Sequence, residues 1–253
     1  KIGSKYDLTM VKEFLFVDAF IDLETLTIYK DYITATSNLD LIAYNNGVYG
    51  DYIIEYIIKN EELAVVIMAG GQGTRLGHTG PKGTYILDID GGKSIFEILV
   101  DKLKDIQEKY DVSPMFYIMT SEENNKETVE FFAKHRNFGY EKDKNLFFFK
   151  QGELPMVDTE GKILIGEDGL IKSAADGHGG IYESLVKNGM TKKMRELGVE
   201  WLFIGGVDNC LVKMVDPLLM GIAIQKQVTA AGKSVVKAKQ QKKVGVFCKK
   251  NGK

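Results

Sequence analysis

The feature that most constrains the fold of this chain is an alternation of short apolar runs with longer amphipathic stretches from residue 63 onward. The apolar runs are rich in β-branched and aromatic residues, which favours strands. Strands are predicted at Leu63–Met68, Met115–Met119, Leu146–Lys150, Trp201–Gly205 and Val244–Cys248. Strands that alternate with helices build a largely parallel, doubly wound sheet of the α/β class. Ligands of such sheets bind beyond the carboxyl ends of the strands.

Helices are predicted between and after these strands. Ser94 and Glu97 have the spacing of a capping box, and the apolar residues that follow recur at helical intervals. A second helix is expected to start at Ser121, and a third is expected to run over Ile181–Leu197. Asp216-Pro217 is typical of a helix start, because aspartate caps the first turn and proline suits its first position. A fourth helix is therefore expected there.

Residues 1–60 do not share this alternation, so they are interpreted as an appended segment, and residues 61–253 are interpreted as one α/β domain. The 253 residues, of which 44 % are apolar, are enough to bury the core of such a domain. The first residue is not Met, and the last predicted strand lies close to the end of the chain. We therefore expect the domain to be incomplete.

The charge and the cysteine content narrow the class of partner and the compartment. The formal net charge is −2, whereas a general nucleic-acid binder is usually strongly basic. The apolar runs are too short to span a bilayer, and the first residues lack a signal-peptide pattern. Cys210 and Cys248 are far apart and have no metal-ligand spacing, which fits a reducing compartment. We expect a cytoplasmic protein that binds neither nucleic acid nor membranes; the sequence does not indicate its oligomeric state.

A glycine-rich loop follows the first predicted strand directly. Gly70, Gly71 and Gly73 let the backbone turn sharply and bring its N–H groups close to a bound anion. Arg75 and Lys82 then place two cations near the same point. Backbone donors combined with cations are what a triphosphate requires. The loop is therefore predicted to bind the phosphates of a nucleotide.

Two other glycine-loop motifs do not match the sequence of this loop. A dinucleotide fingerprint needs a third glycine at the position that Leu76 occupies here. A Walker loop needs Gly-Lys-Ser/Thr after four spacer residues, and this loop lacks it. The remaining alternative is a plain tight turn between a strand and a helix, which would leave Arg75 and Lys82 without a role.

The loop and several later segments together resemble the UDP-sugar pyrophosphorylases, and most closely the UDP-N-acetylglucosamine pyrophosphorylase branch of that family. The motifs that carry the resemblance are Gly70–Gly77, Pro81–Gly83, Tyr117–Ser121, Phe131–Gly139, Phe148–Pro155, Asp176–Tyr182, Val207–Lys213 and Asp216-Pro217. They occur in the family's order and cover residues 63–217 almost continuously. The resemblance is thus far more specific than the glycine loop alone.

The resemblance implies a Rossmann-like nucleotide-diphospho-sugar transferase fold, with residues 61–253 as its UTP-binding catalytic domain. It also implies roles for individual residues. Arg75 and Lys82 would bind phosphate oxygens and serve catalysis, Gln151 and Gly177 would contact the uracil, and Asp208 would bind the nucleotide and help to hold Mg²⁺. The residues expected to line the uridine and its phosphates are Met68, Ala69, Gly70, Gly71, Gly73 and Thr74.

The residue expected to contact the sugar or its phosphate is His178. The chain reads Gly-His-Gly-Gly over Gly177–Gly180. The N-acetylglucosamine branch usually has asparagine at the second position, and the UDP-glucose branch usually has histidine. N-acetylglucosamine 1-phosphate is favoured by Gly180 and the flanking sequence, while glucose 1-phosphate or a broad sugar range is the alternative that His178 supports.

The first sixty residues contain two short stretches that resemble later parts of the same family. Leu41–Tyr49 resembles the family's Phe-Asn-Ala-Gly-Asn-Ile stretch, and Phe14–Phe20 resembles its Phe-x-Phe-Asp-x-Phe stretch. One hypothesis is a rearranged chain in which Asn45 hydrogen-bonds the sugar. The alternative is a natural extension whose similarity arose by chance.

The reaction implied by the resemblance is the transfer of a uridylyl group. UTP and a sugar 1-phosphate would give a UDP-sugar and pyrophosphate, with Mg²⁺ as cofactor. The protein would position the reactants and stabilise charge rather than supply a nucleophile. Because the domain is expected to be incomplete, a non-catalytic UTP-binding fragment stays open as an alternative.

Overall fold

The computed structural model describes residues 62–89, 91–216, 219–220, 223 and 230–232. The chain divides into two compact units, and the architecture below is that of the unit spanning Glu55–Val215. Three predictions lie outside the described residues. They are the strand at Val244–Cys248, the domain boundary at residues 60 and 61, and the candidate sugar ligand Asn45.

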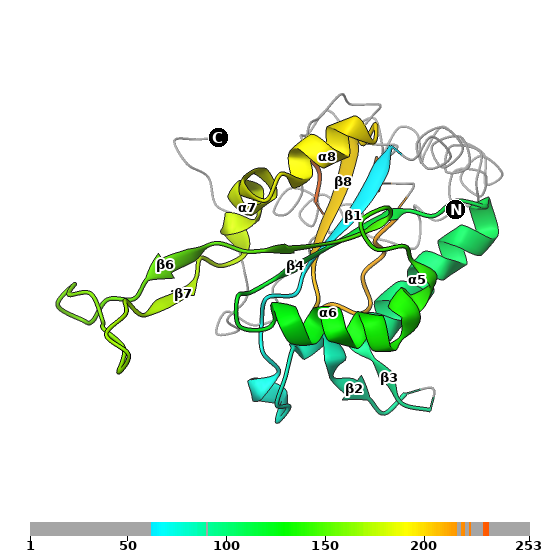
Figure 1. Cartoon of the computed structure of the whole chain (residues 1–253). Helices are drawn as coiled ribbons and strands as arrows, with labels where there is room; N and C mark the ends of the chain where they lie inside the picture. Colours follow the sequence, from blue (N-terminus) through cyan, green and yellow to red (C-terminus); the bar gives the residue numbers. More distant parts are fainter. Residues whose placement is uncertain (1–61, 90, 217–218, 221–222, 224–229, 233–253) are drawn as a thin grey trace, which may run out of the picture. The chain divides into compact units, whose positions relative to one another are not determined.

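A parallel four-stranded sheet forms the centre of this unit (Figure 1). Its strands are β1 (Leu63–Met68), β4 (Met115–Thr120), β5 (Leu146–Lys150) and β8 (Trp201–Gly206), in the spatial order β5-β4-β1-β8. All three pairings are parallel. The predicted strands are confirmed in this region: β1 and β5 have the expected bounds, and β4 and β8 are each one residue longer.

The order of the strands predicts a ligand site beside β1. From β1 the chain moves outward to β4 and β5, and then returns to pair β8 with the opposite side of β1. In open α/β sheets, such a reversal opens a crevice at the carboxyl ends of the two strands that flank it. The residues that end these strands, Met68 and Gly206, are partners in register. The loops that follow β1 and β8 therefore meet at one point.

One face of the sheet is covered by α5 (Ile95–Tyr110) and α6 (Asn125–Lys134). The capping box is confirmed, since the Glu97 N–H donates to Ser94 Oγ at 3.1 Å and the Ser94 N–H donates to Glu97 Oε2 at 2.7 Å. Phe96 of α5 and Phe132 of α6 are completely buried, and their ring centroids are 5.0 Å apart. The interlocked rings fix the two helices against each other and the sheet.

The second helix starts later than predicted. Its first residue is Asn125 rather than Ser121. Ser121 and Asn124 instead form a turn, in which the Ser121 N–H donates to Asn124 Oδ1 and the Asn124 N–H donates to Ser121 Oγ. These reciprocal bonds hold a non-helical turn at the end of β4, as side chains of this type often do.

The opposite face is covered by α7 (Ile181–Lys187) and α8 (Met190–Glu196). The prediction of one continuous helix over Ile181–Leu197 was wrong. Gly189 adopts a φ of +72°, which a helix does not allow, and the Asn188 side chain donates to the carbonyl oxygens of Lys150 and Ser184 at 2.9 and 2.8 Å. The break lets both short helices pack on the core cluster of this face, which includes Ala64, Val66, Tyr117, Phe147, Ile181, Leu185 and Met194.

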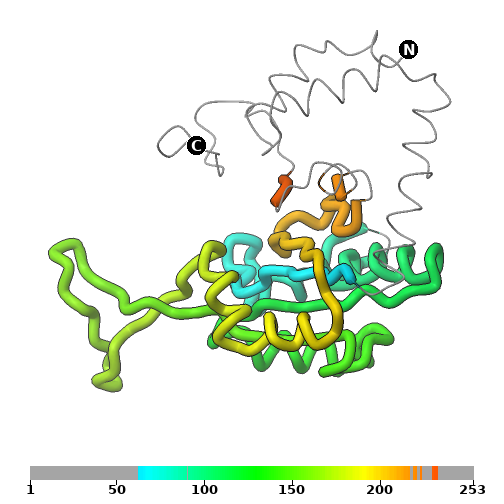
Figure 2. The backbone as a smooth tube through the Cα atoms, turned by 90° about the horizontal axis from the view of Figure 1, so that it is seen from above, coloured from blue at the N-terminus to red at the C-terminus, as the bar shows by residue number. Residues whose placement is uncertain are grey.

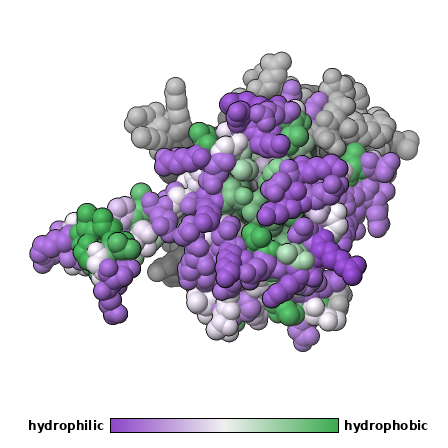
Figure 3. All heavy atoms as spheres, in the orientation of Figure 1, coloured by the Kyte–Doolittle hydropathy of each residue, from purple (hydrophilic) through white to green (hydrophobic). Residues whose placement is uncertain are grey.

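Two short antiparallel pairs complete the described unit. β2 (Ile86–Leu87) pairs with β3 (Lys93–Ser94), and β6 (Glu153–Pro155) pairs with β7 (Ser173–Ala175). The second pair begins a long arm that extends away from the sheet, as Figures 1 and 2 both show. The arm exposes a set of large apolar side chains, which Figure 3 shows gathered on it: Leu154, Met156, Val157, Ile163, Ile165, Leu170 and Ile171.

The helix start predicted at Asp216-Pro217 belongs to the other unit. Asp216 Oδ1 accepts the Leu219 N–H at 3.4 Å, and its carbonyl oxygen accepts the Met220 N–H at 3.0 Å, as expected of a capping residue. Pro217 lies outside the described residues. Within the part of the chain that the structure describes, every helix is too short or too polar to cross a membrane.

Tyr117 carries a polar atom that the fold does not satisfy. Its ring stacks on Phe147 with centroids 4.5 Å apart, and its buried hydroxyl has no hydrogen-bond partner among the described residues. Burial raises the pKa of this phenol, so the hydroxyl stays protonated. Because an unsatisfied buried hydroxyl is costly, Tyr117→Phe is expected to raise the free energy of unfolding by about 1 kcal/mol. Urea unfolding measures this change in stability. Tyr182→Phe, at an exposed tyrosine, is the control and should leave the stability unchanged. A Tyr117→Phe protein less stable than the wild type would contradict the prediction.

Candidate functional site

The glycine-rich loop leaves β1 and folds back on itself. The Ala69 N–H donates to the Met119 carbonyl oxygen at 2.7 Å, which continues the sheet by one residue. Further on, the Gly73 N–H donates to the Gly80 carbonyl oxygen at 2.9 Å, and the Lys82 N–H donates to that of Gly71 at 3.0 Å. The second half of the loop is thereby held against the first, so that Lys82 returns to the end of β1.

The first half of the loop presents unpaired backbone donors. The N–H groups of Gly70, Gly71 and Gln72 have no acceptor among the described residues. A Cβ atom on Gly70 would lie 2.7 Å from the side-chain amide of Gln151, so a larger residue would displace that amide. A run of free N–H groups on a glycine-rich backbone is suited to bind phosphate oxygens. Donors of this kind are what the predicted phosphate-binding role requires, and the backbone of Gly70, Gly71 and Gln72 is called the cradle below.

Lys82 and Asp208 come together across this cradle. Lys82 Nζ lies 2.6 Å from Asp208 Oδ1, and Nζ is also 3.7 Å from the point where a Cβ atom of Gly71 would stand. The Lys82 side chain is 15 % exposed, whereas that of Asp208 is 58 % exposed. The two residues follow different strands, and they meet because β1 and β8 are neighbours in the sheet. The pair places one cation and one carboxylate at the carboxyl edge of the sheet.

The position of Lys82 depends on its neighbour Gly83. The two residues belong to a short 3-10 turn, η4 (Lys82–Thr84). Gly83 is buried, and a Cβ atom on it would overlap the ring of Phe96. The glycine therefore allows the turn to sit directly on the aromatic core, which sets the height of Lys82 above the sheet.

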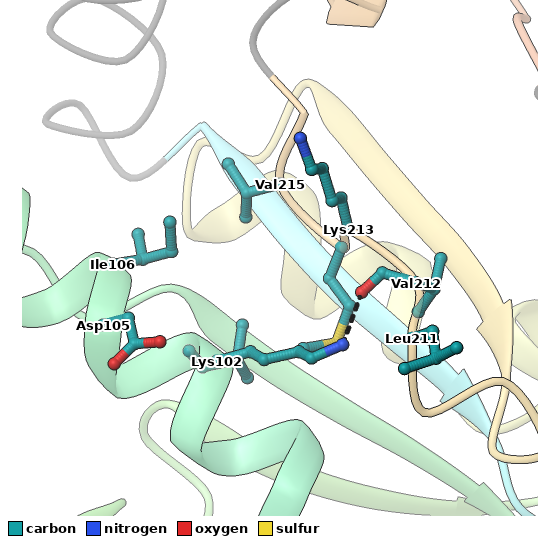
Figure 4. Close-up of a pocket in the computed structure, with 9 residues that line it drawn as sticks. Lys102, Asp105, Ile106, Leu211, Val212, Lys213 and Val215 are labelled. Carbon is teal, nitrogen blue, oxygen red and sulfur yellow. Dashed lines mark hydrogen bonds between the residues drawn. The ribbon is translucent and has the colours of Figure 1, made fainter.

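The loop that carries Asp208 is tied to the body at both ends. The Val207 N–H donates to the Met68 carbonyl oxygen at 3.0 Å. On the far side, Lys102 of α5 donates to the Cys210 carbonyl oxygen. It also donates to the Val212 carbonyl oxygen at 3.2 Å (Figure 4). A pocket of about 360 Å³ lies between this loop and α5, lined by Lys102, Leu103, Asp105, Ile106 and residues 211–215. Sequence reasoning missed Lys102, because a lysine on an amphipathic helix gives no sign of what it contacts.

His178 lies in a turn beside the end of β8. Gly177, which precedes it, adopts a φ of +82°. The exposed His178 ring brings its Cε1 atom to 3.8 Å from the point where a Cβ atom of Gly206 would stand. The carboxylate of Asp176 fills the space in front of Gly152 and Gly180, and its buried Oδ1 has no partner among the described residues. The histidine therefore stands close to the strand that leads to Asp208.

The remaining predicted residues have different surroundings. Met68 is half-buried and Ala69 is buried at the end of β1, next to the cradle. Gly73 uses its N–H within the loop, so it shapes the loop rather than offering a donor. Thr74 and Arg75 are exposed in the 3-10 turn η3 (Thr74–Leu76), and Arg75 has no ion-pair partner among the described residues. Arg75 is thus on the same loop as Lys82 but does not contact Asp208.

Comparison with known proteins connects this arrangement to a family. A family model described as UTP–glucose-1-phosphate uridylyltransferase matches residues 25–253. The chain is 38 % identical over 204 residues to UDP-N-acetylglucosamine diphosphorylase 2 of Arabidopsis thaliana. The matched segment covers 76 % of this chain and 40 % of that protein. The chain therefore spans well under half of this relative's length.

Solved structures agree. A crystal structure from Entamoeba histolytica, assigned as a UDP-N-acetylglucosamine pyrophosphorylase, superposes with a TM-score of 0.66 at 34 % identity, covering 72 % of this chain and 47 % of that one. The structure of the uridine diphosphate N-acetylglucosamine pyrophosphorylase of Trypanosoma brucei, solved with an inhibitor, superposes with a TM-score of 0.65 at 29 % identity. This match covers 70 % of this chain and 38 % of that one. With the predicted nucleotide-diphospho-sugar transferase fold and the matched sequence, these findings show that the chain belongs to the UTP–glucose-1-phosphate uridylyltransferase family, that of the UDP-sugar pyrophosphorylases.

Proposed function

We propose that this chain is a uridylyltransferase that joins UTP and a sugar 1-phosphate to give a UDP-sugar and pyrophosphate. The observation that carries the proposal is the contact of 2.6 Å between Lys82 and Asp208 beside the free N–H groups of the glycine loop. Donors, a cation and a carboxylate are brought together where α/β sheets bind ligands. Family membership makes UTP the nucleotide of choice for this site.

In the proposed complex, the phosphates lie on the N–H groups of Gly70, Gly71 and Gln72. Lys82 exchanges its contact with Asp208 for a phosphate oxygen, and exposed Arg75 closes onto the phosphates from the other side of the loop. Gln151 lies against Gly70, so its amide is placed to read the donor and acceptor groups of the uracil, together with the backbone of Gly177. These residues thus form two sets, one that contacts the phosphates and one that contacts the uracil base.

The chemistry requires positioning and charge stabilisation. An oxygen of the sugar phosphate attacks the α-phosphorus of UTP in line, the new P–O bond forms as the bond to the bridging oxygen breaks, and pyrophosphate leaves with that electron pair. Negative charge accumulates on the oxygens around the α-phosphorus and on the leaving group. Lys82, Arg75 and the backbone donors stabilise this charge. Such electrostatic stabilisation is usually the largest contribution that a preorganised site makes to the rate.

Asp208 suits the Mg²⁺ that the family fold implies. Within the described residues no group of three or more His, Cys, Asp or Glu side chains could hold a metal by itself. Mg²⁺ at nucleotide sites needs only one or two carboxylates, because phosphate oxygens and water supply the other ligands. The half-exposed carboxylate of Asp208 therefore fits, and the ion it would hold neutralises phosphate charge.

We propose N-acetylglucosamine 1-phosphate as the favoured sugar substrate. The relatives from Arabidopsis thaliana and Trypanosoma brucei are named for UDP-N-acetylglucosamine. The histidine at position 178 supports glucose 1-phosphate as the second candidate. His178 stands beside Gly206, which leads directly to Asp208, so this side chain is placed to discriminate between sugars.

Pyrophosphate release from UTP and Mg²⁺ with a panel of sugar 1-phosphates tests the proposal. We expect fastest release with N-acetylglucosamine 1-phosphate, a UDP-sugar of the matching mass, and no release when the metal is chelated. Faster release with glucose 1-phosphate would assign the second sugar. UTP binding by calorimetry without release from any sugar would identify a binding fragment, and the absence of UTP binding would refute the proposal.

A further inference from the structure

Asn124 contacts the glycine loop from below, although it belongs to a different segment. It is completely buried, and its side-chain Nδ2 donates to the Ala69 carbonyl oxygen at 2.9 Å and to the Gly71 carbonyl oxygen at 3.3 Å. Its Oδ1 accepts the Ser121 N–H at 2.9 Å, which fixes which end of the amide is oxygen. One side chain thus connects the turn after β4 with the loop after β1.

The two carbonyl groups that Asn124 binds determine where their peptide N–H groups point. In a trans peptide the C=O and the following N–H lie in one plane and point in opposite directions. The Ala69 carbonyl shares its peptide with the Gly70 N–H, and the Gly71 carbonyl shares its peptide with the Gln72 N–H. Since both carbonyls point towards buried Asn124, both N–H groups face away from it, and neither has an acceptor among the described residues.

Glycine makes this constraint necessary. A Gly70-Gly71 pair can rotate its peptides at little cost. The Lys82 N–H already holds the Gly71 carbonyl oxygen at 3.0 Å, whereas the Ala69 carbonyl oxygen is bound by Asn124 alone among the described residues. A preorganised donor is effective because no free energy is spent on turning it when charge arrives. Asn124 holds the Ala69 carbonyl and shares the Gly71 carbonyl with the Lys82 N–H, so it supplies this order from the buried side of the loop.

We propose that Asn124 is a positioning residue of the phosphate cradle: its amide aims the Gly70 N–H group at the phosphates of UTP and, together with the Lys82 N–H, aims that of Gln72. The inference rests on the proposed function, because it assigns these donors to that nucleotide. Asn124 does not touch the ligand itself. Its effect is therefore specific to the phosphates and leaves the contacts of the base unchanged.

The test compares Asn124→Asp with Ser121→Ala. Aspartate keeps an oxygen for the Ser121 N–H, but it cannot donate to Ala69 and Gly71. Ser121→Ala removes the other bond of the same turn and leaves the Asn124 amide in place. We expect Asn124→Asp to weaken UTP binding at least tenfold by calorimetry, whereas Ser121→Ala binds UTP within twofold of the wild type. Uridine, titrated by NMR, should bind all three proteins alike.

NMR also reports the donors directly. Addition of UTP should shift the amide protons of Gly70 and Gln72 strongly downfield in the wild type. In Asn124→Asp the shift of Gly70 should be much smaller, and that of Gln72 should fall less, because the Lys82 N–H still holds the Gly71 carbonyl. If Asn124→Asp does not fold, Asn124→Ala, which also lacks the donor, takes its place. Equal loss of UTP and uridine affinity would show a merely structural role and overturn the inference, as would unchanged UTP affinity. Failure of the wild type to bind UTP would instead refute the proposed function.

Discussion

Replacing Lys82 by methionine is expected to lower the rate of pyrophosphate release by about a hundredfold, in line with the loss of one preorganised donor to a developing oxyanion. Methionine keeps the length and the apolar stem of the side chain, which is 15 % exposed, but removes its charge. The folded state should change little, because the partner carboxylate of Asp208 is 58 % exposed and stays hydrated. The loss of rate should therefore reflect weaker stabilisation of the charge on the reacting phosphates.

Steady-state release of pyrophosphate at saturating UTP, with UTP affinity from calorimetry, measures this loss. Lys144→Met is the matched control, because Lys144 forms an exposed ion pair with Glu141 at 2.8 Å, on the segment before β5. The control should keep wild-type turnover. Turnover of Lys82→Met within threefold of the wild type would remove Lys82 from the proposed machinery.

Gly83→Ala is expected to lower the free energy of unfolding by about 3 kcal/mol, at the upper end of the usual cost of overpacking a core. The added methyl group would overlap the ring of Phe96, which is completely buried and packs edge-to-face on Phe132. Because the ring is completely buried, we expect the turn that carries Lys82 to move instead. UTP affinity should fall with stability, because the displaced turn no longer returns Lys82 to the cradle.

Urea unfolding gives the stability change, and calorimetry gives the UTP affinity. Gly179→Ala is the control for stability, since a Cβ atom there would have no neighbour within 4 Å and its φ is not positive. That variant should unfold within about 0.5 kcal/mol of the wild type, as surface substitutions usually do. A Gly83→Ala protein as stable as Gly179→Ala would show that the core around Phe96 adapts more readily than its packing indicates.

The strands and the first helix could be predicted because their signals are local. Each core strand is a short apolar run, and the bonds of the capping box at Ser94 join residues three positions apart. The break between α7 and α8 also had a local signal, the pair Asn188-Gly189, but the apolar periodicity on both sides of it favoured a single helix. Tertiary contacts of the Asn188 side chain decided the outcome.

The site was predictable only in part. The glycine loop with Arg75 and Lys82 indicates phosphate binding from its residues alone, whereas the role of Asp208 came from family resemblance, and the structure then placed it on Lys82. Asn124 and Lys102 could not be predicted as site residues, because both act on backbone carbonyl oxygens of distant segments. Such contacts depend on which strands become neighbours, and no local pattern encodes this.

The neighbour relation of β1 and β8 also has a consequence for synthesis on the ribosome. β1 emerges early and β8 emerges last among the four strands, yet β8 covers one whole edge of β1. Until β8 arrives, the nascent chain exposes the hydrogen-bonding edge of an apolar strand, which is the kind of surface on which unfinished chains associate. Release of the chain before residue 201 should therefore give insoluble material, and a chaperone that binds β1 should hold it until the last strand pairs.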